Sequence, residues 1–358
     1  MAVSNLQVGL AIAGGLVLAA VVAHGAWTSR KNKPRQAEPD FPRADPFETE
    51  GGQRDPSFDP DGLAPLPADP VDAMDPPMLL PVVERHAPID SLIDVVVPVA
   101  IDDIISGDAV LAVMPSTRRV GSKPLSVEGR NTLSQQWEPP QAGQRYTALQ
   151  FGLQLANRSG ALNDIEYSEF VHKVHAMSDA LGGTPSFPEM RDEVARAKEL
   201  DAFASEHDAQ LGMRLRALYA AWSPGYIQQH AARHGFVPGV IPGRMVLPAS
   251  TPGLPPVLVL AFDTQAALAE DLSQTAIRDL SLSLDVAQVS RQEHAFERMR
   301  EVAQSLAQAM EGQVTDDLGQ ALSEAAMDQI SLDLQDLYDT LDARELSAGS
   351  VLARRLFS

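Results

Sequence analysis

Two pairs of histidines have spacings that allow two side chains to meet on one face of a helix. His172 and His175 lie three residues apart, and His230 and His234 lie four apart. Such pairs can hold zinc, but a zinc peptidase also needs a glutamate placed between them in a set order, and neither pair has it. Both pairs fall in amphipathic stretches where polar faces are expected. We therefore predict solvated histidines, no metal and no other cofactor.

Other residue patterns give equally little indication of catalysis. Asp316 and Asp317 are adjacent, but neighbouring residues of a strand point to opposite faces and cannot share a substrate. The sequence has no glycine-rich phosphate loop and no nucleophile elbow, and without cysteine it has no thiolate nucleophile, disulfide or cysteine-ligated metal. We predict that the protein is not an enzyme. A membrane-tethered hydrolase with an unrecognised site is the least favoured alternative.

The charge of the chain argues against nucleic-acid binding. Asp and Glu number 48 against 28 Lys and Arg, which gives a formal net charge of -20. Phosphate backbones are bound by an excess of Lys and Arg, so no nucleic-acid partner is expected. Hydrophobic residues make up 44% of the 358 residues, enough to build at least one full core.

The N-terminal residues have the length and composition of a membrane span. From Leu6 to Trp27 the chain has no formal charge, and roughly twenty such residues suffice for a helix to cross a bilayer. Four basic residues follow directly, which by the positive-inside rule places the rest of the chain in the cytoplasm and the N-terminus outside. A cleaved signal peptide would need basic residues before the apolar run instead. We predict a transmembrane helix within residues 1–28.

Residues 29–88 are rich in proline and aspartate and show little apolar periodicity. Such a composition cannot repay the entropy of ordering, so we predict a disordered linker that acts as a tether. Its reach would be roughly 40 Å as a coil and about 150 Å when extended. The apolar stretch Met78–Val83 is interpreted as the start of packing against the folded region.

The folded region repeats itself after 129 residues. The shift superimposes a strand-like alternation and, after it, a helical pattern that ends at a glycine. The match therefore preserves both the two-residue period of a strand and the 3.6-residue period of a helix. We predict two tandem copies, at residues 89–208 and 209–344, followed by a C-terminal tail at 345–358. The matching sets are Phe151, Leu153 and Leu155 with Leu280, Leu282 and Leu284; Tyr167, Phe170, Met177 and Leu181 with Phe296, Met299, Leu306 and Met310; and Gly183 with Gly312.

The second copy shows its elements most clearly. The patterns predict an α+β fold, in which an antiparallel-rich sheet of split βαβ type has helices on one face. Ser223 and Ser323 are expected to cap helices, and Gly312 to end one. The predicted order is strand 211–219, helix 224–233, strands 244–247, 257–262 and 280–286, helix 296–310, short strand 314–318 and a last helix after Ser323.

Three stretches resemble ZipA, a bacterial cell-division protein. HGAWTSRK at 24–31 resembles its membrane exit, and AFERMREVAQSLAQAMEGQVTDDLGQALSEAAMDQI at 295–330 is similar to part of its C-terminal domain. Residues 167–183 resemble the same helix and its glycine stop in the first copy. The resemblance implies a single-pass protein of the inner membrane, with a periplasmic N-terminus and cytoplasmic domains. It also implies a divisome adaptor that binds the C-terminal tail of FtsZ on an open sheet face during septum formation.

Strand alternation predicts which residues form that open face. If Leu280, Leu282 and Leu284 face the helices, their neighbours on both strands face outward. In the first copy both faces of the strand near residue 95 are apolar, so its valines are included as candidates. The predicted partner-binding residues are Arg214, Arg216, Leu218, Ser281, Ser283, Val95 and Val97.

The candidate residues depart from the apolar, partly aromatic groove that the resemblance implies. With two arginines and two serines, the second copy could grip an acidic peptide electrostatically, bind weakly, or have lost the function to the first copy. Plain solvated surface is equally consistent with the arginines. The runner-up function is a membrane-anchored structural scaffold that binds itself or another membrane protein.

Overall fold

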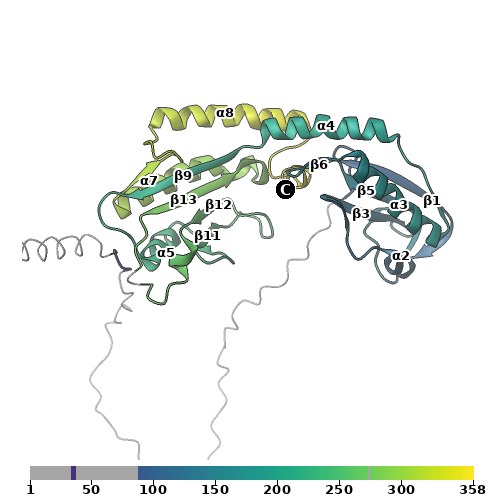
Figure 1. Cartoon of the computed structure of the whole chain (residues 1–358), viewed down its shortest axis with the longest axis horizontal. Coiled ribbons are helices and arrows are strands. Elements are labelled where there is room, and N and C mark those ends of the chain that lie inside the picture. The colour runs from purple at the N-terminus through teal and green to yellow at the C-terminus, as the bar shows by residue number, and fades with distance from the viewer. Residues whose placement is uncertain (1–33, 38–87, 273–274) are drawn as a thin grey trace, which may run out of the picture. The chain divides into compact units, whose positions relative to one another are not determined.

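The computed structural model describes residues 34–37, 88–272 and 275–358 (Figure 1). All of these residues fall within one compact unit. Alternating apolar residues build two six-stranded antiparallel sheets, and amphipathic helices pack against them. The predicted α+β class is therefore confirmed. The predicted span lies outside the described residues, and among the helices described none is long and apolar enough to cross a membrane.

The first sheet has the strand order β2-β3-β5-β1-β8, with β4 paired to β3. Helix α3 begins at a capping box, in which the side chain of Asn163 accepts hydrogen bonds from the backbone and Glu166 bonds back. The elements of this copy are β1 (Asp94–Ser106), α2 (Gly107–Val113), β2 (Arg119–Val120), β3 (Lys123–Asn131), β4 (Trp137–Glu138), β5 (Arg145–Gln154), the small hairpin β6 (Ala156–Asn157) and β7 (Gly160–Ala161), α3 (Asp164–Leu181), β8 (Gly183–Pro185) and α4 (Met190–His207).

The second sheet has the order β10-β11-β12-β13-β9-β14. Ser223 and Ser323 cap their helices as predicted, because each side-chain oxygen accepts a backbone N–H of the first turn. The elements are β9 (Gln210–Ala217), α5 (Pro224–Ala232), β10 (Val237–Pro238), β11 (Arg244–Leu247), β12 (Leu258–Ala261), α6 (Thr264–Ala267), β13 (Asp279–Asp285), the 3-10 turns η1 (Val286–Gln288) and η2 (Arg291–Glu293), α7 (Ala295–Met310), β14 (Gly312–Thr315), α8 (Glu324–Ala343) and α9 (Val351–Leu356).

The two sheets repeat one topology. Strands β2-β3-β5-β1-β8 correspond in order to β11-β12-β13-β9-β14, and the second sheet adds β10 at its edge. A shift of 129 residues moves 164–181, which is α3, onto 293–310, which contains α7. The repeat seen in the apolar pattern therefore has a counterpart in the order of the elements.

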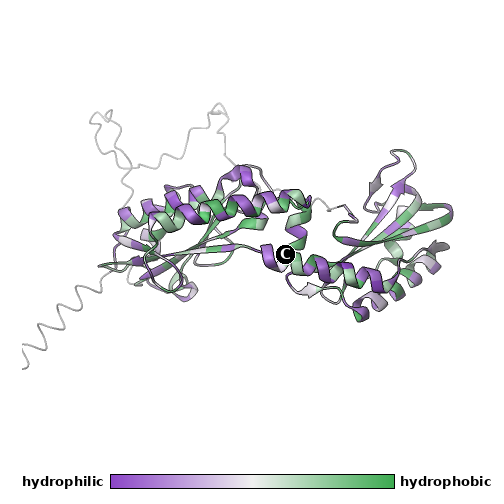
Figure 2. Cartoon of the chain, turned by 90° about the horizontal axis from the view of Figure 1, so that it is seen from above, coloured by the Kyte–Doolittle hydropathy of each residue, from purple (hydrophilic) through white to green (hydrophobic). Residues whose placement is uncertain are grey.

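The core of the second copy lies between the sheet and its helices. Leu280, Leu282 and Leu284 of β13 are almost fully buried, and they face the apolar stripe of α7. Full burial of such a side chain stabilises the fold by about 1.5–3 kcal/mol. Figure 2 shows hydrophilic and hydrophobic residues alternating along the helices, as in helices with one buried side.

Residues 345–358 contain α9, which contacts both copies. Gln288 of η1 donates a hydrogen bond to the carbonyl of Phe357 at 2.7 Å, and Gln154 of β5 donates one to the carbonyl of Arg355 at 2.7 Å. Arg355 also forms an ion pair with the buried carboxylate of Asp94 at 2.5 Å. The last residues of the chain therefore complete the packing of both sheets.

A candidate peptide-binding face

One face of the second sheet is open to solvent. Helices α5, α7 and α8 pack together on the other face, and strand alternation turns the polar residues of β9 and β13 away from them. Arg214 and Arg216 have side chains 51% and 67% exposed, and Leu218 is 53% exposed. Ser281 and Ser283 lie on the same face. The structure thus places Arg214, Arg216, Ser281 and Ser283 on one face of the sheet, while Leu218 follows the end of β9.

Both arginines already have carboxylate neighbours. Arg214 Nε lies 3.1 Å from Asp317 Oδ1, and Arg216 Nε lies 3.7 Å from Asp279 Oδ1. Exposed pairs of this kind contribute at most about 1 kcal/mol each. An acidic ligand would therefore replace the aspartate beside each arginine by its own carboxylate. Breaking the existing ion pair costs little free energy, and the net gain in binding free energy is small as well.

A row of directly paired residues crosses the open face. Arg244 pairs with Ala261, Ala261 with Ser281, and Ser281 with Arg214. Arg244 is exposed, and in the part of the chain that the structure describes it forms no ion pair. The prediction omitted Arg244, although its alternation with the buried Met245 is the same signal that identified the other arginines.

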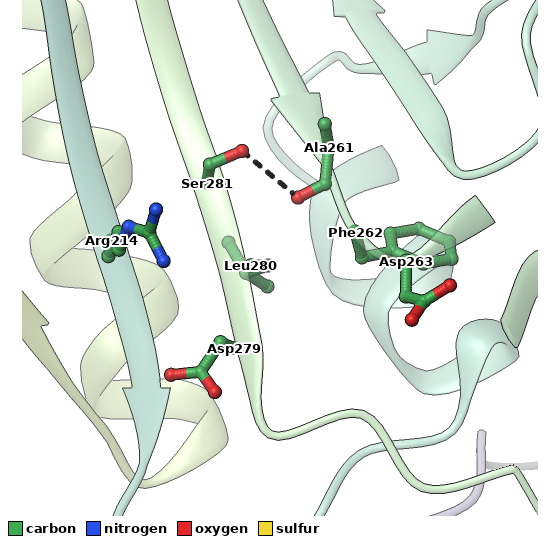
Figure 3. A pocket seen from close by; sticks show the side chains of 7 residues that line it. All are labelled: Arg214, Ala261, Phe262, Asp263, Asp279, Leu280 and Ser281. Atoms are coloured by element: carbon green, nitrogen blue, oxygen red, sulfur yellow. Dashed lines mark hydrogen bonds between the residues drawn. The ribbon is translucent and has the colours of Figure 1, made fainter. Parts of the chain in front are cut away.

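A shallow hollow of about 240 Å³ lies beside this row (Figure 3). Arg214 and Asp279 stand on one side of it, and Phe262 and Asp263 on the other. Two of its lining residues are joined by a hydrogen bond, in which Ser281 Oγ donates to the carbonyl of Ala261 at 3.3 Å. Cofactor sites usually occupy about 300–1,000 Å³, so this hollow suits a single side chain of an extended ligand.

Two candidates in the first copy were placed on the wrong face. Val95 and Val97 are fully buried and point into the core with Phe151, so neither can contact a partner on the open face. The error has a simple physical origin: both faces of β1 carry apolar residues, and alternation then gives no direction. The exposed residues of this strand segment are Pro98 and Ala100.

The open face of the first sheet is partly covered by the chain itself. The Ile89 N–H donates a hydrogen bond to Glu128 Oε1 at 3.0 Å, and the Ile89 side chain packs on Gly152 so closely that any Cβ there would clash. Gln150 donates to the other oxygen of Glu128 at 2.7 Å. An incoming peptide would have to displace these contacts.

One histidine of each pair lies within hydrogen-bonding distance of a polar group of the protein. His172 Nδ1 lies 2.9 Å from the carbonyl of Ser168, and His234 Nε2 lies 3.2 Å from Ser305 Oγ. Among the described residues no group of three or more His, Cys, Asp or Glu side chains is arranged to hold a metal ion. Asp316 Oδ1 accepts hydrogen bonds from the N–H groups of Leu318 and Gln320 and so stabilises the local turn.

Fold and surface together define a class: an α+β domain whose sheet has one helix-covered face and one face open to solvent. Residues 263–332 match the family model of ZipA, C-terminal FtsZ-binding domain. The match runs from α6 through β13, α7 and β14 into α8. The predicted resemblance is therefore confirmed, and this part of the chain is ZipA-like. Among curated proteins no significant match to the chain was found.

Proposed function

We propose that the protein is a non-catalytic cell-division adaptor that binds the C-terminal tail of FtsZ on the open face of its second copy. The observation that carries this proposal is the match of residues 263–332 to the FtsZ-binding domain of ZipA. The matched segment includes β13, which contributes Ser281 and Ser283 to the open face.

The second copy is the better candidate for the binding site. Its open face carries exposed side chains, a hollow and three arginines, whereas Ile89 and Glu128 occupy the corresponding face of the first copy. A peptide meets fewer intramolecular competitors on the second sheet. We assign the first copy a supporting role.

Recognition of an acidic peptide would be electrostatic and modest in strength. Arg244 offers a charge without a carboxylate partner in the described chain. Arg214 and Arg216 would each release an aspartate in order to bind a carboxylate of the peptide. Interactions between exposed charges weaken as salt rises, so the affinity should fall with ionic strength.

The adaptor role also requires attachment to the membrane. The uncharged run from Leu6 to Trp27 and the basic residues after it support a single inner-membrane span with the two copies in the cytoplasm. In this arrangement FtsZ polymers are tethered to the bilayer through one polypeptide, without any chemical step.

Calorimetric titration with a synthetic FtsZ C-terminal peptide tests the proposal. Exchanging Arg214 and Arg216 for Ser should weaken binding about fivefold at low salt, since two exposed charge contacts contribute about 1 kcal/mol together. The matched control is R291S/R300S, which removes two ion-paired arginines away from the open face, with side chains 48% and 28% exposed. Equal affinity of both double variants, or no binding by the unmodified chain, would overturn the proposal and favour the scaffold function.

A further inference from the structure

Residues 34–37 lie on the second copy, although they belong to the stretch predicted to be a linker (Figure 1). The Arg35 N–H donates a hydrogen bond to the carbonyl of Ala221 at 2.7 Å, and Ser223 N–H donates to the carbonyl of Arg35 at 2.9 Å. Arg35 thereby forms a parallel β-bridge with Trp222, which is itself bridged to Ile277. The segment joins the fold as an added strand residue.

The side chain of Arg35 reinforces this backbone pairing. Its guanidinium forms an ion pair with Glu311 and donates a hydrogen bond to Tyr226. The hydrogen bond that Glu311 accepts from Arg35 lowers the pKa of Glu311, and Glu311 and Tyr226 raise the pKa of Arg35. Pro34 is buried beside them. Backbone, charge and burial therefore all contribute to one contact.

Glu311 has a backbone conformation that a glutamate rarely adopts. It ends α7 with φ 52° and ψ 50°, in the left-handed region where glycine is the usual residue. The repeat provides an internal comparison, because a shift of 129 residues places Gly182 of the first copy on this position. Gly182 ends α3 with φ 66° and ψ 34°. The second copy thus has a strained glutamate where the first has an unstrained glycine, and that glutamate is the partner of Arg35.

We propose that the surface formed by residues 221–226 and Glu311 is a docking site for the chain's own segment 34–37, and that this docking holds the second copy close to the membrane. The distance part rests on the proposed N-terminal anchor. Only residues 28–33 separate Trp27 from the docked segment, and six residues span at most about 20 Å.

Docking changes the effect that the Pro/Asp-rich stretch has on the distance between the second copy and the bilayer. Residues 38–87 join Ala37, which is docked on the second copy, to Pro88 at the start of the first copy. Both attachment points then belong to one folded unit. The length of this stretch consequently does not set the distance of the second copy from the bilayer.

Limited trypsin digestion of the full chain in detergent tests the docking itself. Cleavage after Arg35 should be at least about tenfold slower than after Arg30, because the bond is accessible only when the segment detaches. E311K should abolish this protection. E301K, which makes the same charge change at an exposed position of α7 without contact to Arg35, should preserve it.

Glu311→Gly separates loss of docking from loss of folding. Glycine relieves the left-handed strain, so the variant should melt no lower than the unmodified chain, yet Arg35 should be cleaved faster by about tenfold. Equal cleavage after Arg30 and Arg35 in the unmodified chain, or unchanged protection in both E311K and E311G, would overturn the proposed docking.

Energy transfer in vesicles of bacterial lipids tests the proposed short distance between the second copy and the membrane. The chain has no cysteine, so T251C provides one dye position on the second copy, and the acceptor dye is placed on lipid headgroups. Transfer should fall in E311K and R35E and recover in the charge-swapped R35E/E311R. Equal transfer in all variants that remain bound to vesicles would refute the distance part. Failure to bind vesicles would instead refute the proposed anchor, while the digestion still reports on docking.

Discussion

The ion pair between Arg355 and Asp94 allows a demanding test of how the last residues stabilise the first copy. Asp94 Oδ1 lies 2.5 Å from the guanidinium, and the side chains are only 1% and 14% exposed for Asp94 and Arg355. Asp94 Oδ2 also accepts the N–H of Asp90 at 2.9 Å, and Arg355 donates to the carbonyl of Pro88 at 3.0 Å. Replacing Arg355 by Met keeps much of the apolar stem and leaves the buried carboxylate without its cation.

Removing one partner of a buried ion pair costs about 3–5 kcal/mol, because the remaining charge stays buried without compensation. The residual hydrogen bond from Asp90 and the partial exposure of Arg355 favour the lower end, about 3 kcal/mol. The paired variant D94N/R355M buries no charge, so it should recover most of this loss.

The loss should depend on pH in a defined direction. Burial raises the pKa of Asp94 above its ordinary value, while Arg355 opposes this shift, so R355M should raise that pKa further. A carboxyl group with a raised pKa in the folded state favours folding in acid and loses that contribution as pH rises through the folded-state pKa. The destabilisation by R355M should therefore be largest at neutral pH and shrink in acid.

Urea denaturation followed by circular dichroism measures these differences. Arg354→Met is the control, because the neighbouring arginine bonds to the carbonyl of Gly349 and has no carboxylate partner in the described chain. A loss below about 1 kcal/mol for R355M at neutral pH, or an equal loss in acid, would show that the buried pair is not what stabilises this contact.

Two further predictions concern the core and the anchor. Leu282→Ala should lower the free energy of unfolding by about 2–5 kcal/mol, because Leu282 is fully buried, whereas Ser283→Ala on the open face should stay within about 0.5 kcal/mol; equal midpoints in urea for the two variants would contradict the assignment of the two faces. Deleting residues 1–28 should move the protein out of the membrane fraction, since the long apolar run lies there; a truncated chain that still floats with vesicles would require another attachment.

Strand alternation and helix capping predicted several strands and helices between residues 210 and 343. The predicted strand 244–247 and the predicted start at Pro224 agree with β11 and α5. These signals are local: one face of each strand is apolar, and each capping serine lies next to the turn that it serves. Arg214 and Arg216 of the open face followed from the same alternation.

Signals that depend on distant residues were not accessible from the sequence. Gly312 was predicted to end α7, but the left-handed residue is Glu311, whose side chain contacts a segment at the other end of the chain. Val95 and Val97 were misplaced because both sides of β1 are apolar, and the side that is buried depends on α3 and β5. Local patterns predict the helices and strands, whereas long-range contacts determine which face of a strand is buried and which residue ends a helix.

The position of α9 at the end of the chain has a consequence for folding during synthesis. Domains generally fold from the N-terminus as the ribosome releases them, and contacts between distant residues form late. The hydrogen bond from Gln154 to the carbonyl of Arg355 joins residues 201 positions apart. The first copy therefore leaves the ribosome with Asp94 and Gln154 lacking Arg355, and it obtains this partner only after residues 351–356 have been translated. A premature stop before α9 would therefore remove contacts from the copy that was synthesised earliest, as well as from Gln288 in the second copy.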